Sequence, residues 1–191
     1  MAARKNYPEL ARNISESYTP MVETAKKIKA KDPEAKVVFI GPCIAKKIEG
    51  FNPIVAKYVD FIMTFEELMA IFQAKNIDPT KITEYEEIND ASPLGRGFPV
   101  AGGVINAILN YIEQKAGKKP DFPYETADTL QDCMGLLKKF KNNQFDPMPK
   151  LIEGMACPNG CVGGPGTLAP LKRAQNDVAK FSKTAKKQIF D

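Results

Sequence analysis

Residues 157–166, with the sequence CPNGCVGGPG, restrict the local backbone more than any other segment of this 191-residue chain. Two prolines and three glycines fall within the eight positions 158–165. Proline removes a backbone donor and glycine is entropically costly in a helix, so the segment is predicted to be an irregular loop. This loop carries Cys157 and Cys161, and cysteines on an irregular loop need a physical explanation.

Three explanations are available for this cysteine pair. Glycines let a backbone fold closely around a bulky ligand and turn its amides toward it, as the sulfides of an iron-sulfur cluster require. A turn with buried cysteines is a simpler alternative. A disulfide is typical of secreted chains, but the start MAARKNYPEL has no signal-peptide pattern, so a cytoplasmic location is expected. Ligation of a metal or cluster is therefore the better explanation.

The composition removes several other kinds of chemistry. The chain has no histidine, which excludes serine-histidine and cysteine-histidine catalysis and every histidine-ligated metal. The net charge of +4 comes mostly from basic runs at 26–31 and 183–188, which are typical of solvated helix faces, so no nucleic-acid partner is expected. No apolar run approaches the roughly 20 residues of a membrane-spanning helix, so no membrane partner is expected either.

Short apolar runs alternate with amphipathic stretches along the rest of the chain. This alternation predicts an α/β fold, with a parallel or mixed sheet flanked by helices. The length allows one substantial domain or two small lobes. We expect helices at 19–33, 65–76, 102–117, 128–143 and from 168 onward, strands at 35–43, 58–63 and 151–155, and a proline-rich linker at 118–125.

The other two cysteines lie in different surroundings. Cys43 follows Gly41 and Pro42 at the end of an apolar run that is predicted to be a buried strand. Loops at the carboxyl ends of such strands usually carry function. Cys133 shares a helical face with leucine and phenylalanine side chains, which favours core packing, with a role as a fourth ligand as the alternative.

Two motifs carry a resemblance to a known family. GPCIAKKIE at 41–49 and IEGMACPNGCVGGPG at 152–166 resemble the motifs PCxxKxxE and MACxxGCxxGGG of iron-only (FeFe) hydrogenases, in the C-terminal part of the catalytic domain. The resemblance extends from Asn6 to the glycine loop. It implies reversible hydrogen oxidation and proton reduction at an H-cluster. That cofactor is a four-iron four-sulfur cluster held by four cysteines, one of which bridges to a di-iron subcluster with CO, cyanide and a dithiolate.

The resemblance assigns roles to the metal-facing residues. It implies that Cys43 and Cys157 are cluster ligands and that Cys161 is the bridging thiolate. It also implies that Lys46 donates to a cyanide ligand, which agrees with the strong donation expected of an ammonium beside an anionic cofactor. An exposed lysine on the turn is the alternative for Lys46.

Three further residues match family positions. Glu49 matches the carboxylate of the first motif, and Ser15 matches a serine of the family's proton pathway. Proton relay needs titratable or hydroxyl groups of this kind within hydrogen-bond reach. Helix capping is an equally good explanation for Ser15. Met155 resembles a residue packed near the di-iron centre, and simple apolar packing is its alternative.

The chain also departs from the family pattern. The first cluster motif, TSCxPxW, should precede Asn6 and is absent, as are ferredoxin-like cluster motifs. Gly41 stands where catalytic members carry methionine, and VGGPG replaces the usual ending of the second motif. We therefore expect residues 1–191 to be a C-terminal fragment of a hydrogenase-like catalytic domain, from a parent that catalyses or senses hydrogen.

The fragment interpretation implies partners and limits. The missing N-terminal part of the domain and a ferredoxin-like electron-transfer domain or protein are the expected partners. The fragment alone should hold no stable cluster and show no activity. Cys43 and the Cys157/Cys161 loop should converge at one sheet edge, with an apolar patch around Lys46 and Glu49. Two alternatives stay open: a non-catalytic iron-sulfur scaffold or assembly factor, and a structural α/β interaction domain with unliganded thiols.

Overall fold

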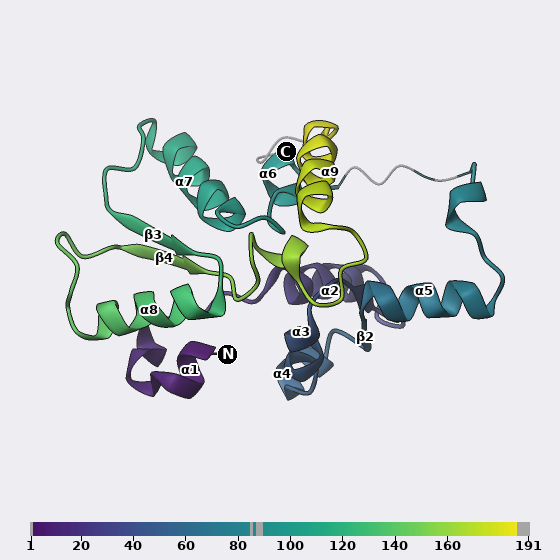
Figure 1. The fold of residues 1–191 in the computed structure, drawn as a ribbon, viewed down its shortest axis with the longest axis horizontal. Coiled ribbons are helices and arrows are strands. Elements are labelled where there is room, and N and C mark those ends of the chain that lie inside the picture. Colours follow the sequence, from purple (N-terminus) through teal and green to yellow (C-terminus); the bar gives the residue numbers. More distant parts are fainter. Residues whose placement is uncertain (1, 85, 87–89, 187–191) are drawn as a thin grey trace. The chain divides into compact units, whose positions relative to one another are not determined.

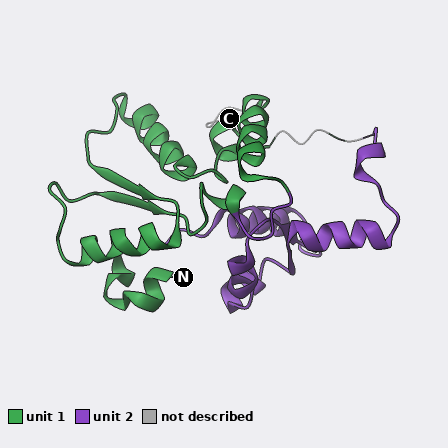
Figure 2. Ribbon diagram, in the orientation of Figure 1, with its two compact units in different colours: residues 1–13, 86–163, 169–191 green, residues 14–85, 164–168 purple. Residues whose placement is uncertain are grey.

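The computed structural model describes residues 2–84, 86 and 90–186 (Figure 1). The chain divides into two compact units (Figure 2). Unit 1 contains residues 1–13, 86–163 and 169–191, and unit 2 contains residues 14–85 and 164–168. The short segment 164–168 thus belongs to unit 2, although the residues on both sides of it in the sequence belong to unit 1. No helix among the described residues is long and apolar enough to cross a membrane.

Unit 2 is built around a two-stranded parallel sheet. Strand β1 pairs with β2 so that Val38 lies opposite Phe61 and Ile40 lies opposite Met63. The hydrophobic core consists of five buried residues, Met21, Val22, Ala25, Val55 and Val59, with Phe39 and Ile62 packed against them. The elements of unit 2 are α2 (Pro20–Lys31), β1 (Val38–Ile40), α3 (Ile44–Gly50), α4 (Pro53–Ala56), β2 (Phe61–Met63), α5 (Phe65–Ala74) and the 3-10 helix η2 (Pro79–Lys81).

The start of α5 agrees in detail with the sequence. The Thr64 hydroxyl accepts a hydrogen bond from the Glu67 amide at 3.2 Å, and the Glu67 carboxylate accepts one from the Thr64 amide at 2.8 Å. This reciprocal capping box satisfies two amides that the first turn of a helix leaves unpaired. The predicted helix at 65–76 is therefore confirmed, with an end at Ala74.

The prediction of a fully buried strand at 35–43 is wrong. β1 has only three residues, and Val38 and Ile40 are 42% and 39% exposed. Side chains alternate between the two faces of a strand, so Phe39 and Ile62 face the core while Val38, Ile40 and Phe61 lie on the other face. Phe61 is 61% exposed, so this second face of the sheet is apolar and open to solvent.

Unit 1 has its own two-stranded parallel sheet. β3 and β4 pair with Tyr124 opposite Leu151 and Ala127 opposite Gly154. Figure 1 shows α7 and α8 on opposite sides of this strand pair. The elements of unit 1 are α1 (Ala2–Asn6), the 3-10 helix η1 (Pro8–Asn13), α6 (Pro93–Arg96), α7 (Gly103–Ala116), β3 (Tyr124–Ala127), α8 (Leu130–Lys141), β4 (Leu151–Gly154), the 3-10 helix η3 (Cys161–Gly163) and α9 (Leu171–Lys183).

Strand β3 corrects the expected linker at 118–125. The prolines of that segment indicated an unpaired connection, but its last residues begin a strand that forms a ladder with β4. The partner strand lies more than twenty residues further along the chain, so the pairing is a tertiary contact that local composition does not reveal.

A buried arginine ties α9 into unit 1. Arg96 is 8% exposed, and its Nη1 donates to the Phe181 carbonyl at 3.0 Å and to the Thr184 hydroxyl at 2.8 Å. Its guanidinium also lies 4.0 Å from the centre of the Phe181 ring. A cation at the last carbonyls of a helix satisfies unpaired acceptors and opposes the negative end of the helix dipole.

Candidate functional site

Cys43 lies where β1 meets α3. The Gly41 amide donates to the Met63 carbonyl at 3.1 Å, so the strand pairing continues to the residue before Pro42. Cys43 is the N-cap residue of α3, is half-buried and makes no capping hydrogen bond with its side chain. The predicted placement of Cys43 at the carboxyl end of a strand is therefore confirmed.

Lys46 and Glu49 form an ion pair on α3. The Lys46 Nζ lies 2.6 Å from the Glu49 Oε2, and the two side chains are 21% and 25% exposed. The other carboxylate oxygen of Glu49 accepts a hydrogen bond from the Thr19 hydroxyl at 3.0 Å. Lys46, Glu49 and Thr19 thus make one partly buried polar network, and Lys46 is not a freely solvated surface group.

Thr19 is a site residue that the sequence did not identify. Thr19 occupies the N-cap position of α2, but its side chain makes no capping bond. Its hydroxyl instead donates to Glu49, thirty residues further along the chain. No local pattern could have indicated this contact, because it depends on how α2 and α3 pack.

The exposed apolar residues of α3 do not surround this network. Ile44 and Ile48 are 52% and 56% exposed. At about 100° per residue, they lie on the side of the helix away from Lys46 and Glu49. The apolar patch expected around Lys46 and Glu49 is therefore displaced on α3 to the other side of the helix.

The Cys157/Cys161 loop begins directly after β4. The Met155 amide donates to the Ala127 carbonyl at 2.8 Å and extends the β3–β4 ladder. The Gly160 amide then donates to the Cys157 carbonyl at 3.0 Å and closes a turn. Asn159 and Gly160 both adopt the left-handed conformation, with φ of 58° and 95°. The predicted irregular loop is confirmed between β4 and the 3-10 helix η3.

The loop glycines are required by contacts within the protein. A Cβ at Gly160 would lie 2.5 Å from the Ala101 amide nitrogen, and one at Gly163 would lie 2.1 Å from the Pro158 carbonyl oxygen. Both distances are impossible for a real side chain. The sequence predicted that these glycines let the loop fold around a ligand. In the structure, Gly160 and Gly163 instead allow neighbouring segments of the protein backbone to approach the loop closely.

Cys133 is part of the packing of unit 1. Its thiol lies 3.5 Å from the Met155 carbonyl and 3.8 Å from the Ala127 carbonyl, at the ends of β4 and β3. Burial raises the pKa of the Cys133 thiol, and the negative charges of Asp132 and Asp128 raise it further. Metal ligation needs the thiolate, so these surroundings favour the packing role over ligation.

Ser15 and Met155 have local roles in the structure. Ser15 is exposed, and its hydroxyl accepts a hydrogen bond from the Ser17 amide at 3.2 Å. It caps no helix, because α2 begins at Pro20. Met155 is half-buried beside the end of β4, and its carbonyl lies close to the Cys133 thiol.

The candidate residues fall into two groups. Cys43, Lys46 and Glu49 lie together in unit 2, and Met155, Cys157 and Cys161 lie together in unit 1. The strands that lead to the two groups belong to separate sheets, so the expectation of one common sheet edge is wrong. Across the described ranges, no three cysteine, aspartate or glutamate side chains are gathered to hold a single metal ion.

The donor set nevertheless suits an iron-sulfur cofactor. All four cysteines lie in the described part of the chain, and none forms a disulfide there. Thiolates are the ligands that iron-sulfur clusters use. Cys43, Cys157 and Cys161 are half-buried and follow strands in the sequence, and Lys46 lies three residues after Cys43, on α3.

A five-residue segment of unit 2, residues 164–168, follows the second cysteine loop and is called the strap below. The Gly166 amide donates to the Pro42 carbonyl at 2.9 Å. A Cβ at Gly166 would lie 2.9 Å from the Thr64 Cβ, so only glycine fits against the start of α5. The strap is thus bound to the residue that directly precedes Cys43.

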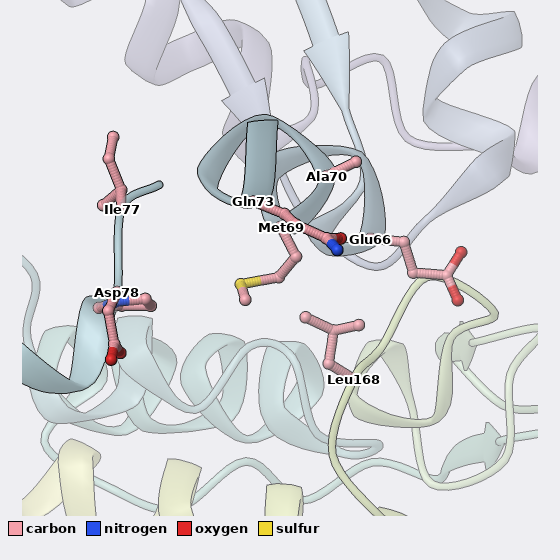
Figure 3. A pocket seen from close by; sticks show the side chains of 8 residues that line it. Glu66, Met69, Ala70, Gln73, Ile77, Asp78 and Leu168 are labelled. Atoms are coloured by element: carbon pink, nitrogen blue, oxygen red, sulfur yellow. The ribbon is translucent and has the colours of Figure 1, made fainter. Parts of the chain in front are cut away.

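The last residue of the strap borders a groove on α5. Leu168 and Met69 both line this groove, which has a volume of about 520 Å³ (Figure 3). Glu66 and Asp78 add carboxylates to the lining. None of the residues that the sequence proposed as ligands or proton carriers lines the groove, so it is separate from the candidate metal site.

The fold and the cysteine loops define a class of protein. The family description "Iron only hydrogenase large subunit, C-terminal domain" matches residues 1–165. The chain therefore belongs to the iron-only hydrogenase large subunit family, in its C-terminal domain.

Curated relatives include both hydrogenases and assembly factors. The periplasmic Fe hydrogenase large subunit of Nitratidesulfovibrio vulgaris is 28% identical over 202 residues, covering 86% of this chain and 48% of that protein. A probable cytosolic Fe-S cluster assembly factor, narfl, of Dictyostelium discoideum is 25% identical over 179 residues, covering 69% of this chain and 34% of that protein. The chain thus spans half or less of the length of these relatives.

Solved structures share the fold. A variant of the FeFe-hydrogenase HydA1 from Chlamydomonas reinhardtii matches with a TM-score of 0.72 and 18% identity, covering 98% of this chain and 65% of that chain. At this identity the likeness shows the fold alone. It confirms the predicted α/β fold class, with parallel strands flanked by helices as in part of an FeFe-hydrogenase catalytic domain.

Proposed function

We propose that this chain forms the C-terminal part of an H-cluster site. Cys43 and Cys157 ligate a four-iron four-sulfur cluster, and Cys161 supplies the thiolate that bridges to the di-iron subcluster. When bound, this cofactor supplies the centre at which protons and electrons are exchanged with hydrogen. The parent protein uses the site for reversible hydrogen oxidation or for hydrogen sensing.

One observation carries this proposal. The hydrogen bond from Gly166 to Pro42 fixes the strap beside the residue before Cys43. Gly166 follows Cys161 by five residues, and a chain of five residues spans at most about 18 Å. This covalent tether limits the separation of Cys161 from Cys43, although the two cysteines are 118 positions apart in the sequence.

The Lys46 network supports the di-iron half of the proposal. An ammonium has three N–H donors, and the Glu49 carboxylate accepts one of them. The ion pair with Glu49 orients Lys46 so that another N–H can donate to a cyanide ligand. Glu49 and the Thr19 hydroxyl hold this geometry and offer a route for a proton, with Ser15 as the proposed outer member. We also propose that Met155 packs near the di-iron subcluster.

The proposed site is completed by other parts of the parent protein. A fourth cluster ligand would come from an N-terminal part of the catalytic domain, and electrons would come from a ferredoxin-like domain or protein. The limited coverage of the relatives supports the first of these partners. We therefore expect this chain alone to bind iron weakly and to show no hydrogenase activity.

A second candidate function is that of a non-catalytic iron-sulfur assembly factor. The similarity to narfl of Dictyostelium discoideum favours it. A simple cluster site has no need of a cyanide donor, so the partly buried pair of Lys46 and Glu49 favours the hydrogenase-like function. The two functions differ in whether a di-iron subcluster is present.

Anaerobic reconstitution of the chain with iron and sulfide tests the ligand set. We expect less than one cluster per chain, in a form that a chelator removes, and we expect iron retention to fall in Cys43→Ser, Cys157→Ser and Cys161→Ser. The matched control is Cys133→Ser, which should retain as much iron as the parent chain. Iron analysis and electron paramagnetic resonance give the readout. Iron retention that depends on Cys133, or on none of the other three cysteines, would contradict the proposal.

A protein in which this chain is restored with an N-terminal part of the catalytic domain separates the two candidate functions. After addition of a synthetic di-iron complex with CO and cyanide ligands, infrared spectroscopy reports the bound ligands. We expect Lys46→Ala to shift or remove the cyanide bands and to leave the iron-sulfur signal unchanged. Absence of bound CO and cyanide bands in the restored protein without the Lys46 substitution, despite a stable iron-sulfur signal, would favour the assembly-factor function.

A further inference from the structure

We propose that Asp128 is a positioning residue that sets the geometry of the Cys157/Cys161 thiol pair. The proposal rests on the ligand roles proposed above. Asp128 is far from both cysteines in sequence and belongs to neither family motif. Its carboxylate nevertheless holds the residue at the centre of the loop between them.

Asn159 is bonded from two sides. Its amide donates to the Asp128 Oδ2 at 3.0 Å, and its carbonyl accepts a hydrogen bond from the Ala101 amide at 2.9 Å. The contact with Asp128 is partly buried. Asn159 is the middle one of the three residues between Cys157 and Cys161, so these two bonds fix the point about which the loop reverses direction.

The backbone at this point needs such support. Asn159 and Gly160 are consecutive residues in the left-handed region, with φ of 58° and 95°. This conformation costs free energy for any residue with a side chain, although asparagine tolerates it better than most. Release of the Asn159 amide would let the turn relax, and the two cysteines are attached directly to that turn.

Asp128 is itself held by rigid elements. It lies between the last residue of β3 and Thr129, the N-cap of α8, whose hydroxyl accepts a hydrogen bond from the Asp132 amide. The carboxylate borders a cavity of about 370 Å³ that is also lined by Asn159, Gly102 and Gln175. Truncation of Asp128 would enlarge this cavity, and water can enter it, so we expect unit 1 to remain folded.

The conservative variant separates geometry from charge. In Asp128→Asn the side-chain oxygen can still accept the Asn159 amide, whereas Asp128→Ala offers no acceptor. A matched control is Asp132→Ala, which removes a carboxylate from the neighbouring first turn of α8. That change removes the hydrogen bond that the Thr129 hydroxyl donates to the Asp132 carboxylate and leaves the acceptor for Asn159 in place.

Two measurements on the full chain test the proposal, in a background that carries Cys43→Ser and Cys133→Ser. The first is hydrogen exchange of the Asn159 amide. The second is capture of the thiol pair by phenylarsine oxide, in which two arsenic-sulfur bonds form and the arsenic-bound oxygen leaves as water with both thiol protons. Arsenic stays trivalent in this reaction, so no oxidant or reductant is needed.

We expect Asp128→Ala to speed exchange at Asn159 and to weaken capture, each by about fivefold, which is the effect of one lost hydrogen bond. Asp128→Asn and Asp132→Ala should stay within about twofold of the background chain. If Asp128→Ala captures phenylarsine oxide as well as the background chain does, the proposal is overturned. It is also overturned if Asp128→Asn weakens capture as much as Asp128→Ala does. An effect on capture combined with cysteine-independent iron retention would support the positioning role while the proposed cluster function fails.

Discussion

The two cysteine loops follow parallel strands in similar ways but are held by different interactions. The Cys43 loop leads into α3, where the side chains of Lys46 and Glu49 form a charged network. The Cys157/Cys161 loop is held by hydrogen bonds of its own backbone, one of which is accepted by the Asp128 carboxylate, and by glycines in close contact with neighbouring backbone. The first loop therefore leads to charged side chains on a helix, and the second presents two thiols on a backbone whose close contacts leave no room for added atoms.

This difference predicts opposite responses to substitution. A close backbone contact has no freedom to adjust, so added atoms in the Cys157/Cys161 loop should reduce stability strongly. A partly solvated ion pair contributes little to stability, so changes near Lys46 should affect the chemistry more than the fold.

The largest expected effect is that of Gly163→Ala. The new Cβ would lie 2.1 Å from the Pro158 carbonyl oxygen, and a backbone atom cannot move away without breaking the turn. We expect a loss of about 3 kcal/mol or more in the free energy of unfolding, measured by urea denaturation. Retention of parent stability would show that the loop is more adaptable than its contacts indicate.

The matched substitution in the other loop is Gly41→Ala. Its Cβ would lie 2.9 Å from the end of the Phe39 ring, and a side chain can rotate away, so the same measurement should show a smaller loss of about 1 kcal/mol. The control is Gly135→Ala on α8, where a Cβ would have no neighbour within 4 Å. Gly135→Ala should increase stability by about 0.5–1 kcal/mol, because alanine favours the helix.

Sequence reasoning succeeded where the determining interactions are local. The helix predicted at 65–76 begins with hydrogen bonds between residues three positions apart, and the irregular course of residues 157–166 follows from their prolines and glycines. Cys43 at a strand end followed from the apolar run before it. The family resemblance, confirmed by the match over residues 1–165, identified both cysteine motifs.

Sequence reasoning failed where the contact partner is distant. Thr19 reaches Glu49 across 30 positions, and Asp128 reaches Asn159 across 31. β3 was mistaken for the end of a linker because its partner strand lies far along the chain. The same limit explains why the strands that precede Cys43 and Cys157 were assigned to one sheet.

An intermediate effect is expected at the Glu49 network. Glu49→Ala removes the partner of Lys46 and the acceptor of Thr19, and Thr19→Val removes only the hydroxyl. Each variant should lose about 1 kcal/mol of stability by urea denaturation. The double variant should lose less than the sum, because both changes remove the same hydrogen bond. Strict additivity would contradict a shared network.

The smallest expected effect concerns acid stability in unit 2. The Val37 amide at 2.8 Å and the Lys29 ammonium at 2.9 Å, in that order of importance, lower the pKa of the Asp60 carboxyl. An unfolded aspartate has a pKa near 3.9, so unfolding takes up a proton in acid. The stabilisation by Asp60 is therefore complete above that pH and is lost as the pH falls through the lower folded value.

In Asp60→Asn the amide oxygen can still accept the Val37 amide, but the charge is gone. We expect hydrogen exchange in β1 and β2 to depend less steeply on pH below about 4 in this variant, after correction for the intrinsic rate. Asp177→Asn provides the control, because Asp177 pairs with Arg173 at 3.6 Å on the exposed surface of α9. If Asp60→Asn keeps the pH dependence of the parent chain, the charge of Asp60 does not stabilise the start of β1, and the hydrogen bond to Val37 alone accounts for its role.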